Sequence, residues 1–235
     1  MDASPAPSRS VAAVIVAAGE SRRMAGIDKI FSSLNGKPLI AHSLEVFSAF
    51  PAVDQIVLVL SPQRLAEAEK LLFRNQYSKL KALCPGGARR QDSVLAGLQR
   101  LAPCQWVMVH DGARPNIDTA LLQRGLDAAA ETGAAIAAVS AKDTIKLVEK
   151  DGLVKETPPR EKLYQVQTPQ VFRYPLIMQA HQQCKNDFTD DGAMVEALGH
   201  PVKVFMGSYA NLKVTTPEDL LILEALMRKS RSKGS

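Results

Sequence analysis

Cysteine, aromatic residues and long apolar runs are all scarce in this 235-residue chain. The three cysteines, Cys84, Cys104 and Cys184, are far apart and form no CxxC pair, which argues against a disulfide framework and indicates buried thiols in a reducing compartment. The four histidines show no ligand spacing, so no zinc site is expected. No apolar stretch approaches the ~20 residues of a membrane span, and the first ten residues lack the apolar core of a signal peptide. We therefore expect a soluble, cytoplasmic protein without membrane contact.

Charge of one sign does not dominate either, because 29 Lys and Arg residues face 24 Asp and Glu residues, for a formal net charge of +5. The basic residues are spread along the chain, and no basic run is interleaved with aromatic residues. Nucleic acid is therefore not an expected partner. A small anionic substrate fits this balance, and so does an ordinary solvated surface.

Short apolar runs alternate with helical patterns through most of the chain. The expected strands cover 11–18, 55–60, 106–110, 134–139 and 202–206, and the expected helices cover 40–50, 65–75, 92–101 and 119–132. Continuous apolar runs are typical of strands covered on both faces, and their alternation with helices indicates βαβ crossovers. We predict an α/β fold with a mainly parallel sheet, as a single domain over 11–229 between flexible tails at 1–10 and 230–235.

One polar segment interrupts this alternation. Residues 143–164 show short strand-like alternation around Asp151-Gly152, a strong signal for a two-residue hairpin turn. We predict an arm hairpin over about 141–164 that projects from the sheet. An isolated hairpin is marginally stable, which favours docking on a partner such as a second subunit. A floppy surface insertion is the alternative.

The loop after the first expected strand combines small residues with positive charge. Ala17, Ala18 and Gly19 would let backbone N–H groups approach a polyphosphate, and Arg23 and Lys29 would neutralise it. A solvated basic loop is the alternative. The glycines of this loop do not fit GxGxxG, and the second expected strand does not end in an acidic residue, so a nicotinamide dehydrogenase is not favoured.

Two further loops at strand ends carry candidate ligand-binding groups. The Gly86-Gly87 turn could admit a flat base and read its edges with backbone groups, although it also reads as the start of an ordinary capped helix. Asp111 ends the strand over 106–110 and is well placed to help hold Mg²⁺, or else to cap the following turn. Arg114 could orient an anionic substrate through two parallel hydrogen bonds.

Taken together, these stretches are far more specific than any one of them. AAGESRRM, DK, GGARRQDSV, HDGARP, DTIK, QTPQVF, TDD and NLKVTTPEDL occur in an order and at spacings that resemble the methylerythritol phosphate cytidylyltransferase family. The resemblance runs from about Val11 to Met227. The ribitol-phosphate cytidylyltransferases share much of this pattern, so the nucleotide and the reaction are better defined than the acceptor.

The resemblance implies a Rossmann-like nucleotidyltransferase that forms a homodimer through the arm hairpin and uses CTP, a sugar-alcohol phosphate and Mg²⁺. Arg23, Lys29 and Lys213 would be catalytic, and Asp111 would face the metal. The residues expected to bind CTP are Ala17, Ala18, Gly19, Gly87, Arg90, Ser93, Asp111 and Gly112. Those expected to bind the acceptor are Arg160, Thr168, Thr189 and Lys213, with Arg114 and Thr144 from the second subunit.

The implied chemistry needs fixed cations rather than a strong base. A phosphate acceptor is already an anionic nucleophile, and attack on the α-phosphorus of CTP builds charge that cations stabilise. The chain departs from the family where Asp28 precedes Lys29 in a short loop, where Ala88 replaces a frequent acidic residue, and where Gly112 replaces a commoner alanine. A non-catalytic CTP sensor is therefore a further alternative, with the Lys29 loop as its lesion.

Overall fold

The computed structural model describes residues 10–19, 30–72 and 77–231. A seven-stranded sheet in the order β11-β7-β10-β6-β1-β4-β5 forms its centre. These strands are β1 Val11–Ala17, β4 Val53–Leu60, β5 Leu80–Pro85, β6 Trp106–Asp111, β7 Ala134–Ser140, β10 Tyr164–Arg173 and β11 Lys203–Met206. Neighbouring strands are parallel except for β10, which runs antiparallel to β6 and β7. The parallel strands bring their carboxyl ends to one edge, where open α/β sheets bind ligands.

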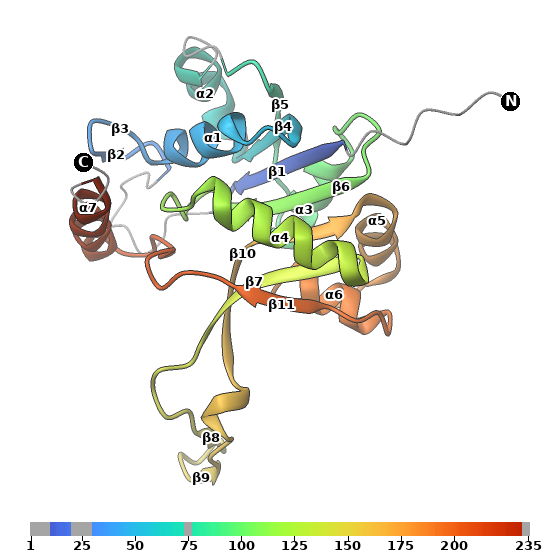
Figure 1. Ribbon diagram of the computed structural model, residues 1–235, viewed down its shortest axis with the longest axis vertical. Coiled ribbons are helices and arrows are strands. Elements are labelled where there is room, and N and C mark those ends of the chain that lie inside the picture. The colour runs from blue at the N-terminus through green and yellow to red at the C-terminus, as the bar shows by residue number, and fades with distance from the viewer. Residues whose placement is uncertain (1–9, 20–29, 73–76, 232–235) are drawn as a thin grey trace, which may run out of the picture.

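Helices cover both faces of the sheet (Figure 1). One face packs against α1 Leu39–Ala49, α2 Leu65–Leu72 and α4 Thr119–Thr132, and the other against α3 Arg90–Leu98, α5 Tyr174–Gln183 and α6 Asp191–Ala197. Strand β1 alternates between the two cores: Ala13 and Ile15 face the first, while Ala12 and Val14 face the second. Burial on both faces explains why its sequence is apolar without interruption. No helix in the described part of the chain is both long and apolar enough to cross a bilayer.

A third, smaller core joins the last helix to the start of α1. Helix α7 Pro217–Arg231 packs through Leu223 against Leu34 and Leu39. Leu34 belongs to the short pair of strands β2 Ser33–Leu34 and β3 Lys37–Pro38. This contact holds the segment 211–216, which precedes α7, near the carboxyl ends of the parallel strands (Figure 1).

All five predicted strands and all four predicted helices are present, with ends shifted by a few residues. The sequence interpretation missed β5, β10 and helices α5, α6 and α7. Strand β10 escaped notice because Gln167 and Gln170 break its apolar pattern, although both side chains are buried and hydrogen-bonded. Helix α2 was predicted to reach residue 75, but residues 73–76 lie outside the described chain.

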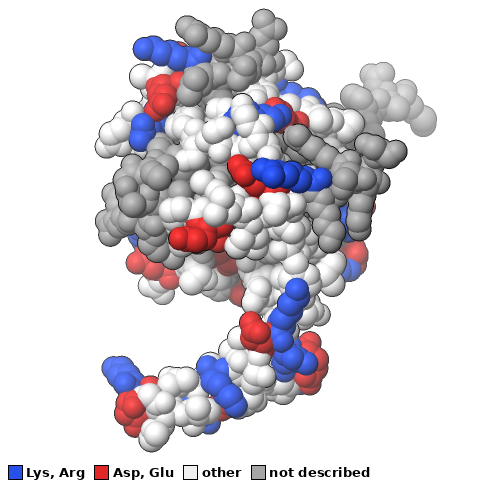
Figure 2. Space-filling model, turned by 90° about the vertical axis from the view of Figure 1, so that its left-hand side faces the viewer, with Lys and Arg blue, Asp and Glu red and all other residues white. Residues whose placement is uncertain are grey.

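The arm hairpin lies where the sequence predicted it, between β7 and β10. Its strands are β8 Leu147–Val148 and β9 Val154–Glu156, and it extends away from the body (Figures 1 and 2). The turn differs from the prediction: Glu149 N–H donates to Leu153 O and Gly152, at φ 87°, donates to Glu149 O, so three residues form the loop. The arm exposes apolar side chains, led by Leu153 at 67% and Val154 at 58%.

Candidate active site

Two adjoining cavities open at the carboxyl edge of the sheet. The larger, of about 530 Å³, is lined by the ends of β1, β4 and β6, by the turn after β5 and by the start of α3. The smaller, of about 250 Å³, lies towards β10 and the start of α6. Arg90, Asp111 and Lys213 line both cavities. A group bound in one cavity therefore meets a group bound in the other at this shared wall of two cations and one carboxylate.

The glycine turn beside the larger cavity is held in shape by Ser93. The Ser93 hydroxyl accepts a hydrogen bond from Gly87 N–H at 3.1 Å and lies 3.1 Å from Arg89 O, to which it donates. The glycines are needed because a Cβ on Gly86 would lie 2.3 Å from Cβ of Ala18, and one on Gly87 would lie 2.4 Å from Cβ of Asp92. The turn thus packs directly on the loop after β1, and Ser93, only 3% exposed, shapes the cavity more than it lines it.

Asp111 is the electrostatic centre of the shared wall. Its carboxylate accepts hydrogen bonds from Lys213 Nζ at 2.7 Å and Arg90 Nε at 3.2 Å, and Arg114 Nε lies 3.9 Å away. Burial alone would raise the pKa of Asp111, but the positive charges of Arg90, Lys213 and Arg114 outweigh it and hold the pKa well below its usual range. Asp111 is therefore ionised at neutral pH, although its side chain is only 10% exposed.

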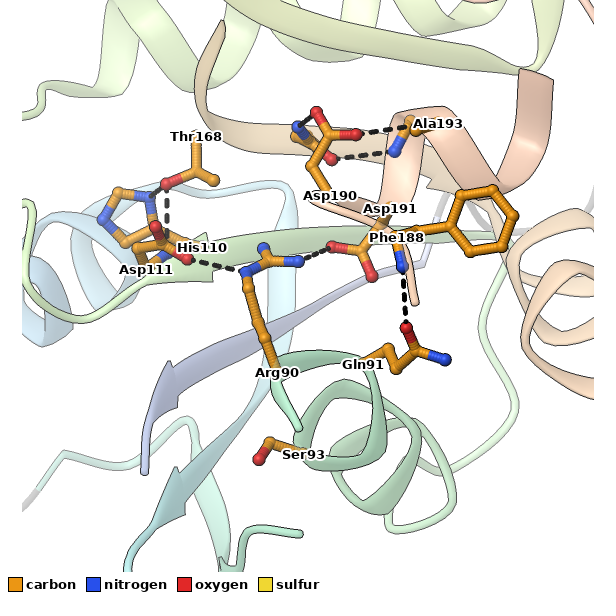
Figure 3. A network of polar contacts seen from close by, with 12 residues as sticks. Arg90, Gln91, Ser93, His110, Asp111, Thr168, Phe188, Asp190, Asp191 and Ala193 are labelled. Carbon is orange, nitrogen blue, oxygen red and sulfur yellow. Dashed lines mark hydrogen bonds and ion pairs between the residues drawn. The ribbon is translucent and has the colours of Figure 1, made fainter. Parts of the chain in front are cut away.

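A buried histidine fixes the backbone around Asp111. His110 Nε2 lies 3.0 Å from Arg114 O, and because a carbonyl can only accept, Nε2 carries the hydrogen. Nδ1 then accepts from the Thr168 hydroxyl at 3.1 Å, while that hydroxyl oxygen accepts from Asp111 N–H at 3.0 Å (Figure 3). Burial lowers the pKa of His110 to about 4, against the opposing effect of Asp111, so the ring is neutral. The Thr168 hydroxyl therefore donates its hydrogen to His110 and has none left to donate to a ligand.

The segment before α7 completes the wall. Arg114 Nη1 donates to Asn211 O at 2.8 Å, and the fully buried Asn211 side chain donates to Thr168 O at 2.8 Å. Two residues on, Lys213 reaches Asp111. Arg114 Nε and Asn211 Oδ1 are buried and have no hydrogen-bond partner among the described residues. Of these two residues, Arg114 lines the smaller cavity and Asn211 lines neither cavity.

The structure brings most of the expected site residues together. Ala17, Ala18, Gly19, Gly87, Arg90, Ser93 and Asp111 line the larger cavity, while Thr168, Thr189 and Arg114 line the smaller, and Lys213 lines both. Gly112 lines neither cavity. It is packed below the loop after β1, where a Cβ would lie 2.8 Å from Cδ1 of Ile40 and 3.0 Å from Cβ of Ala17.

Two residues expected to bind the acceptor lie elsewhere in the structure than the resemblance implies. Arg114, expected from a second subunit, lies beside Asp111 of its own chain. Arg160, expected in the same chain's site, is exposed on the arm, where its Nη1 donates to Lys142 O at 3.0 Å. Thr144 is also exposed on the arm. The two expected catalytic residues Arg23 and Lys29 lie outside the described residues.

Sequence reasoning missed several residues that line the cavities. Ser61, Pro62 and Gln63 follow β4 and line the larger cavity. The rule that ligands bind beyond strand ends would have found them, because β4 was predicted. Gln167, Gln170 and Asp190 line the smaller cavity and belong to the stretches QTPQVF and TDD, whose amide and carboxyl groups carried no assigned role.

The donor set at the shared wall fits a hard divalent cation bound largely through its other ligands. Asp111 is an ionised carboxylate that lines both cavities, and each of its oxygens has a lone pair left beyond its one hydrogen bond. The described residues contain no group of three or more His, Cys, Asp or Glu that could hold a metal. Mg²⁺ tolerates this because it keeps several waters and takes few protein ligands beside substrate phosphates.

Comparison with known proteins shows which family the chain resembles. A family model described as "IspD: 2-C-methyl-D-erythritol 4-phosphate cytidylyltransferase" matches residues 11–229. Proteins of that name from Dehalococcoides mccartyi strain 195 and Geobacillus thermodenitrificans are 53% and 47% identical, over 94% and 92% of this chain and 97% and 96% of theirs.

Solved structures agree as well. The 4-diphosphocytidyl-2C-methyl-D-erythritol synthase of Anaerococcus prevotii superposes with a TM-score of 0.85 at 29% identity, covering 94% of this chain and 97% of that one. The 2-C-methyl-D-erythritol 4-phosphate cytidylyltransferase of Thermus thermophilus superposes with a TM-score of 0.75 at 32% identity, covering 92% and 98%. On this evidence from sequence and fold, the chain belongs to the 2-C-methyl-D-erythritol 4-phosphate cytidylyltransferase family.

Proposed function

We propose that the protein transfers CMP from CTP to 2-C-methyl-D-erythritol 4-phosphate, giving 4-diphosphocytidyl-2-C-methyl-D-erythritol and pyrophosphate. One observation carries the proposal: two cavities of unequal size meet at a wall made of Arg90, Asp111 and Lys213, in a chain of this family. The larger cavity suits a nucleoside triphosphate and the smaller one a short phosphorylated polyol. Names of relatives at 47% and 53% identity favour methylerythritol phosphate over ribitol phosphate as the acceptor.

The geometry suggests how CTP lies in the larger cavity. The base would lie in the larger cavity beside the Gly86-Gly87 turn, with the triphosphate along Ala17 to Gly19. The α-phosphate then reaches the shared wall, where Lys213 is the more accessible cation, with 41% of its side chain exposed. Arg23 and Lys29 would add positive charge to the triphosphate, as the family resemblance implies.

The acceptor phosphate would occupy the smaller cavity beside Arg114, Thr189 and Lys213. One of its oxygens attacks the α-phosphorus, a new P–O bond forms, and the bond between the α-phosphorus and the bridging oxygen of the leaving pyrophosphate breaks. No general base is needed because the nucleophile is already ionised. The described cations act by orienting two mutually repelling anions and by stabilising charge on the transferred phosphoryl group.

We further propose Mg²⁺ as the cofactor, held by Asp111 and the phosphates of CTP. The bound cation would neutralise charge on the triphosphate and the leaving group. Asp111 contributes a fixed anionic oxygen, kept ionised by Arg90 and Lys213. Lys213 then has two tasks, since the ammonium that pairs with Asp111 at 2.7 Å belongs to a residue that lines both cavities.

We also propose a cytoplasmic homodimer joined through the arm. The arm exposes Leu147, Val148, Leu153 and Val154, and the edge strand β11 exposes Val204 and Met206. These apolar surfaces need a partner to be covered. Thr144 and Arg160 are exposed on the arm and line neither cavity of their own chain. We therefore propose that both act in the site of a second chain, as the family resemblance implies for Thr144 but not for Arg160. The three free cysteines, one buried and two partly buried, support a reducing compartment.

The first experiment measures pyrophosphate release with Mg²⁺, CTP and methylerythritol phosphate. ATP, GTP and UTP replace CTP in parallel reactions, and ribitol 5-phosphate replaces the acceptor. Release only with CTP and methylerythritol phosphate is expected. Release with ribitol 5-phosphate alone would keep the reaction and change the acceptor. Binding of CTP without release for any pair would refute the enzyme and leave a nucleotide sensor.

A further inference from the structure

Behind the shared wall lies a buried carboxylate that the proposed chemistry does not use. Asp191, the first residue of α6, is 0% exposed and lines neither of the two cavities. Its Oδ2 accepts from Arg90 Nη1 at 2.7 Å (Figure 3). Its Oδ1 lies 3.1 Å from His181 Nε2. Because an ionised carboxylate can only accept, Nε2 of His181 donates. The three side chains come from α3, α5 and α6, which cover the same face of the sheet.

Asp191 is ionised despite its burial. Burial would raise its pKa, but the positive charge of Arg90 and the hydrogen bond from His181 lower it below the usual value. A buried charge persists only when it is paired and hydrogen-bonded, and here each oxygen has one donor. Asp191 therefore depends on Arg90 for its charge and on His181 for its second hydrogen bond.

Arg90 is held at two points by this arrangement. Its Nε donates to Asp111 at 3.2 Å and its Nη1 to Asp191 at 2.7 Å, so one guanidinium bridges two carboxylates (Figure 3). With Asp111 alone the guanidinium could turn about the bonds of its flexible side chain. The second anchor fixes the plane of the group and hence the direction of Nη2, which is buried and lacks a hydrogen-bond partner among the described residues. Of the three hydrogen-bonded residues His181, Asp191 and Arg90, only Arg90 lines the two cavities.

We propose that His181 and Asp191 are positioning residues, which hold Arg90 so that its guanidinium keeps a fixed orientation toward Asp111 and the phosphoryl group in transfer. A cation that is already oriented stabilises the transition state without reorganising during the reaction. The inference rests on the proposed function, because Arg90 is assumed to face the reacting phosphates. A merely structural pin between α3, α5 and α6 would instead affect folding and leave turnover per folded molecule unchanged.

Replacing His181 separates these two roles. His181→Leu removes the donor to Asp191, whereas His181→Gln can place an amide N–H near the position of Nε2. His200→Leu is the matched control, since His200 Nε2 also bonds a single acceptor, Thr132 O at 2.7 Å, and lines neither cavity. We expect His181→Leu to lower kcat by about 10-fold, with KM for CTP and for the acceptor changed less than about 3-fold. His181→Gln should recover most of the loss, and His200→Leu should lower the melting temperature without lowering kcat.

A double-mutant cycle tests whether both residues act through Arg90. Asp191→Asn keeps the shape of the side chain but removes its charge, and we expect kcat to fall by roughly 10–100-fold. Adding His181→Leu to Asp191→Asn should cost little more, because the route through Asp191 is already broken. CTP affinity measured by calorimetry should change little in any of these variants.

The inference is overturned if His181→Leu folds and keeps its full kcat, or if His181→Gln is as impaired as His181→Leu. Fully additive losses in the double variant would also overturn it, since the two residues would then act separately. A loss seen only as a higher KM would assign Arg90 to ground-state binding instead. Wild-type turnover measured in the same series decides the proposed function, so a failure of that function is seen before any variant is compared.

Discussion

The wall between the cavities and the arm hairpin differ in where their side chains find partners. At the wall, Arg90 and Lys213 both donate to Asp111, and Arg90 also donates to Asp191, so the network joins four segments of one chain. On the arm, the main interactions are local, such as Lys146 Nζ to Thr157 Oγ1 at 2.7 Å and the Lys155–Glu149 ion pair, and apolar side chains face solvent. The charges of the wall are paired within one chain, whereas the arm leaves apolar side chains exposed.

This difference separates chemistry from assembly. Charges that must not move during phosphoryl transfer are held in a preorganised, partly buried network. In the proposed dimer, Thr144 and Arg160 would complete a site from the arm, which extends beyond the body (Figure 1). Two kinds of experiment test this difference: removing charge from the wall, and finding out in which chain's site the arm acts.

The largest effect is expected from Asp111→Asn. The change leaves Arg90, Lys213 and Arg114 without their shared counter-charge and removes the proposed ligand of the metal. We expect kcat to fall on the order of 10³-fold, because several kcal/mol of charge stabilisation are lost. Steady-state pyrophosphate release measures this. Asp118→Asn is the control, since Asp118 caps α4 through Leu121 N–H away from both cavities. Retention of more than about a tenth of wild-type kcat would remove Asp111 from the centre of the site.

The next effect tests whether the arm acts across a dimer. We expect Arg160→Ala and Lys213→Ala each to be nearly inactive alone. When the two chains are unfolded, mixed and refolded, half of the dimers should pair unlike chains, each with one intact site. About a quarter of wild-type turnover should then return, as expected for an isologous dimer with residues exchanged between sites. If Arg160 served its own chain, every site in the mixture would carry a defect and no activity would return.

Much of the wall could be predicted from the sequence, and the arm's position as well, but for different reasons. Asp111, Arg114 and the glycine turn follow predicted strands, so topology alone places them at one edge. Asp191 and His181 could not be found this way, because their role depends on how α5 and α6 pack behind α3, and both helices were missed. The family resemblance placed Arg114 in the second subunit and Arg160 in its own chain's site, whereas in the structure Arg114 lines the smaller cavity of its own chain and Arg160 lines neither cavity.

The third effect is a pH dependence of stability that comes from His110, next to Asp111 of the wall. His110 has its pKa lowered by burial to about 4, from an ordinary value near 6.5. Between these values the unfolded chain binds a proton that the folded chain excludes, so stability is full above about pH 6.5 and falls as the pH drops towards 4. From pH 7 to pH 5 this costs about 2 kcal/mol. His110→Gln, which cannot protonate, should flatten that part of the urea-unfolding profile, and an unchanged slope would contradict the assignment.

The smallest effect is expected from replacing one positive-φ glycine in each region. Gly133 ends α4 at φ 91° in the body, and Gly152 turns the arm hairpin at φ 87°. Alanine at either position costs about 1–2 kcal/mol of local strain, because an L-residue is disfavoured there. Gly133→Ala should lower the free energy of unfolding by that amount, and somewhat more if the Cβ presses on His200 Nε2 at 3.3 Å. Gly152 has open space around it and belongs to a hairpin that extends away from the body (Figure 1), so Gly152→Ala should lower the free energy of unfolding by less than half as much in dilute solution.

Urea unfolding of both glycine variants at low and high protein concentration completes this comparison. If the arm docks on a second chain, the cost of Gly152→Ala should grow with concentration, because the hairpin then unfolds together with the dimer. The cost of Gly133→Ala should not change, since α4 packs within its own body at any concentration. Equal losses for the two variants at every concentration would mean that the hairpin already unfolds with the body of its own chain. The arm would then be as fixed a part of the fold as the wall, and the distinction between them would fail.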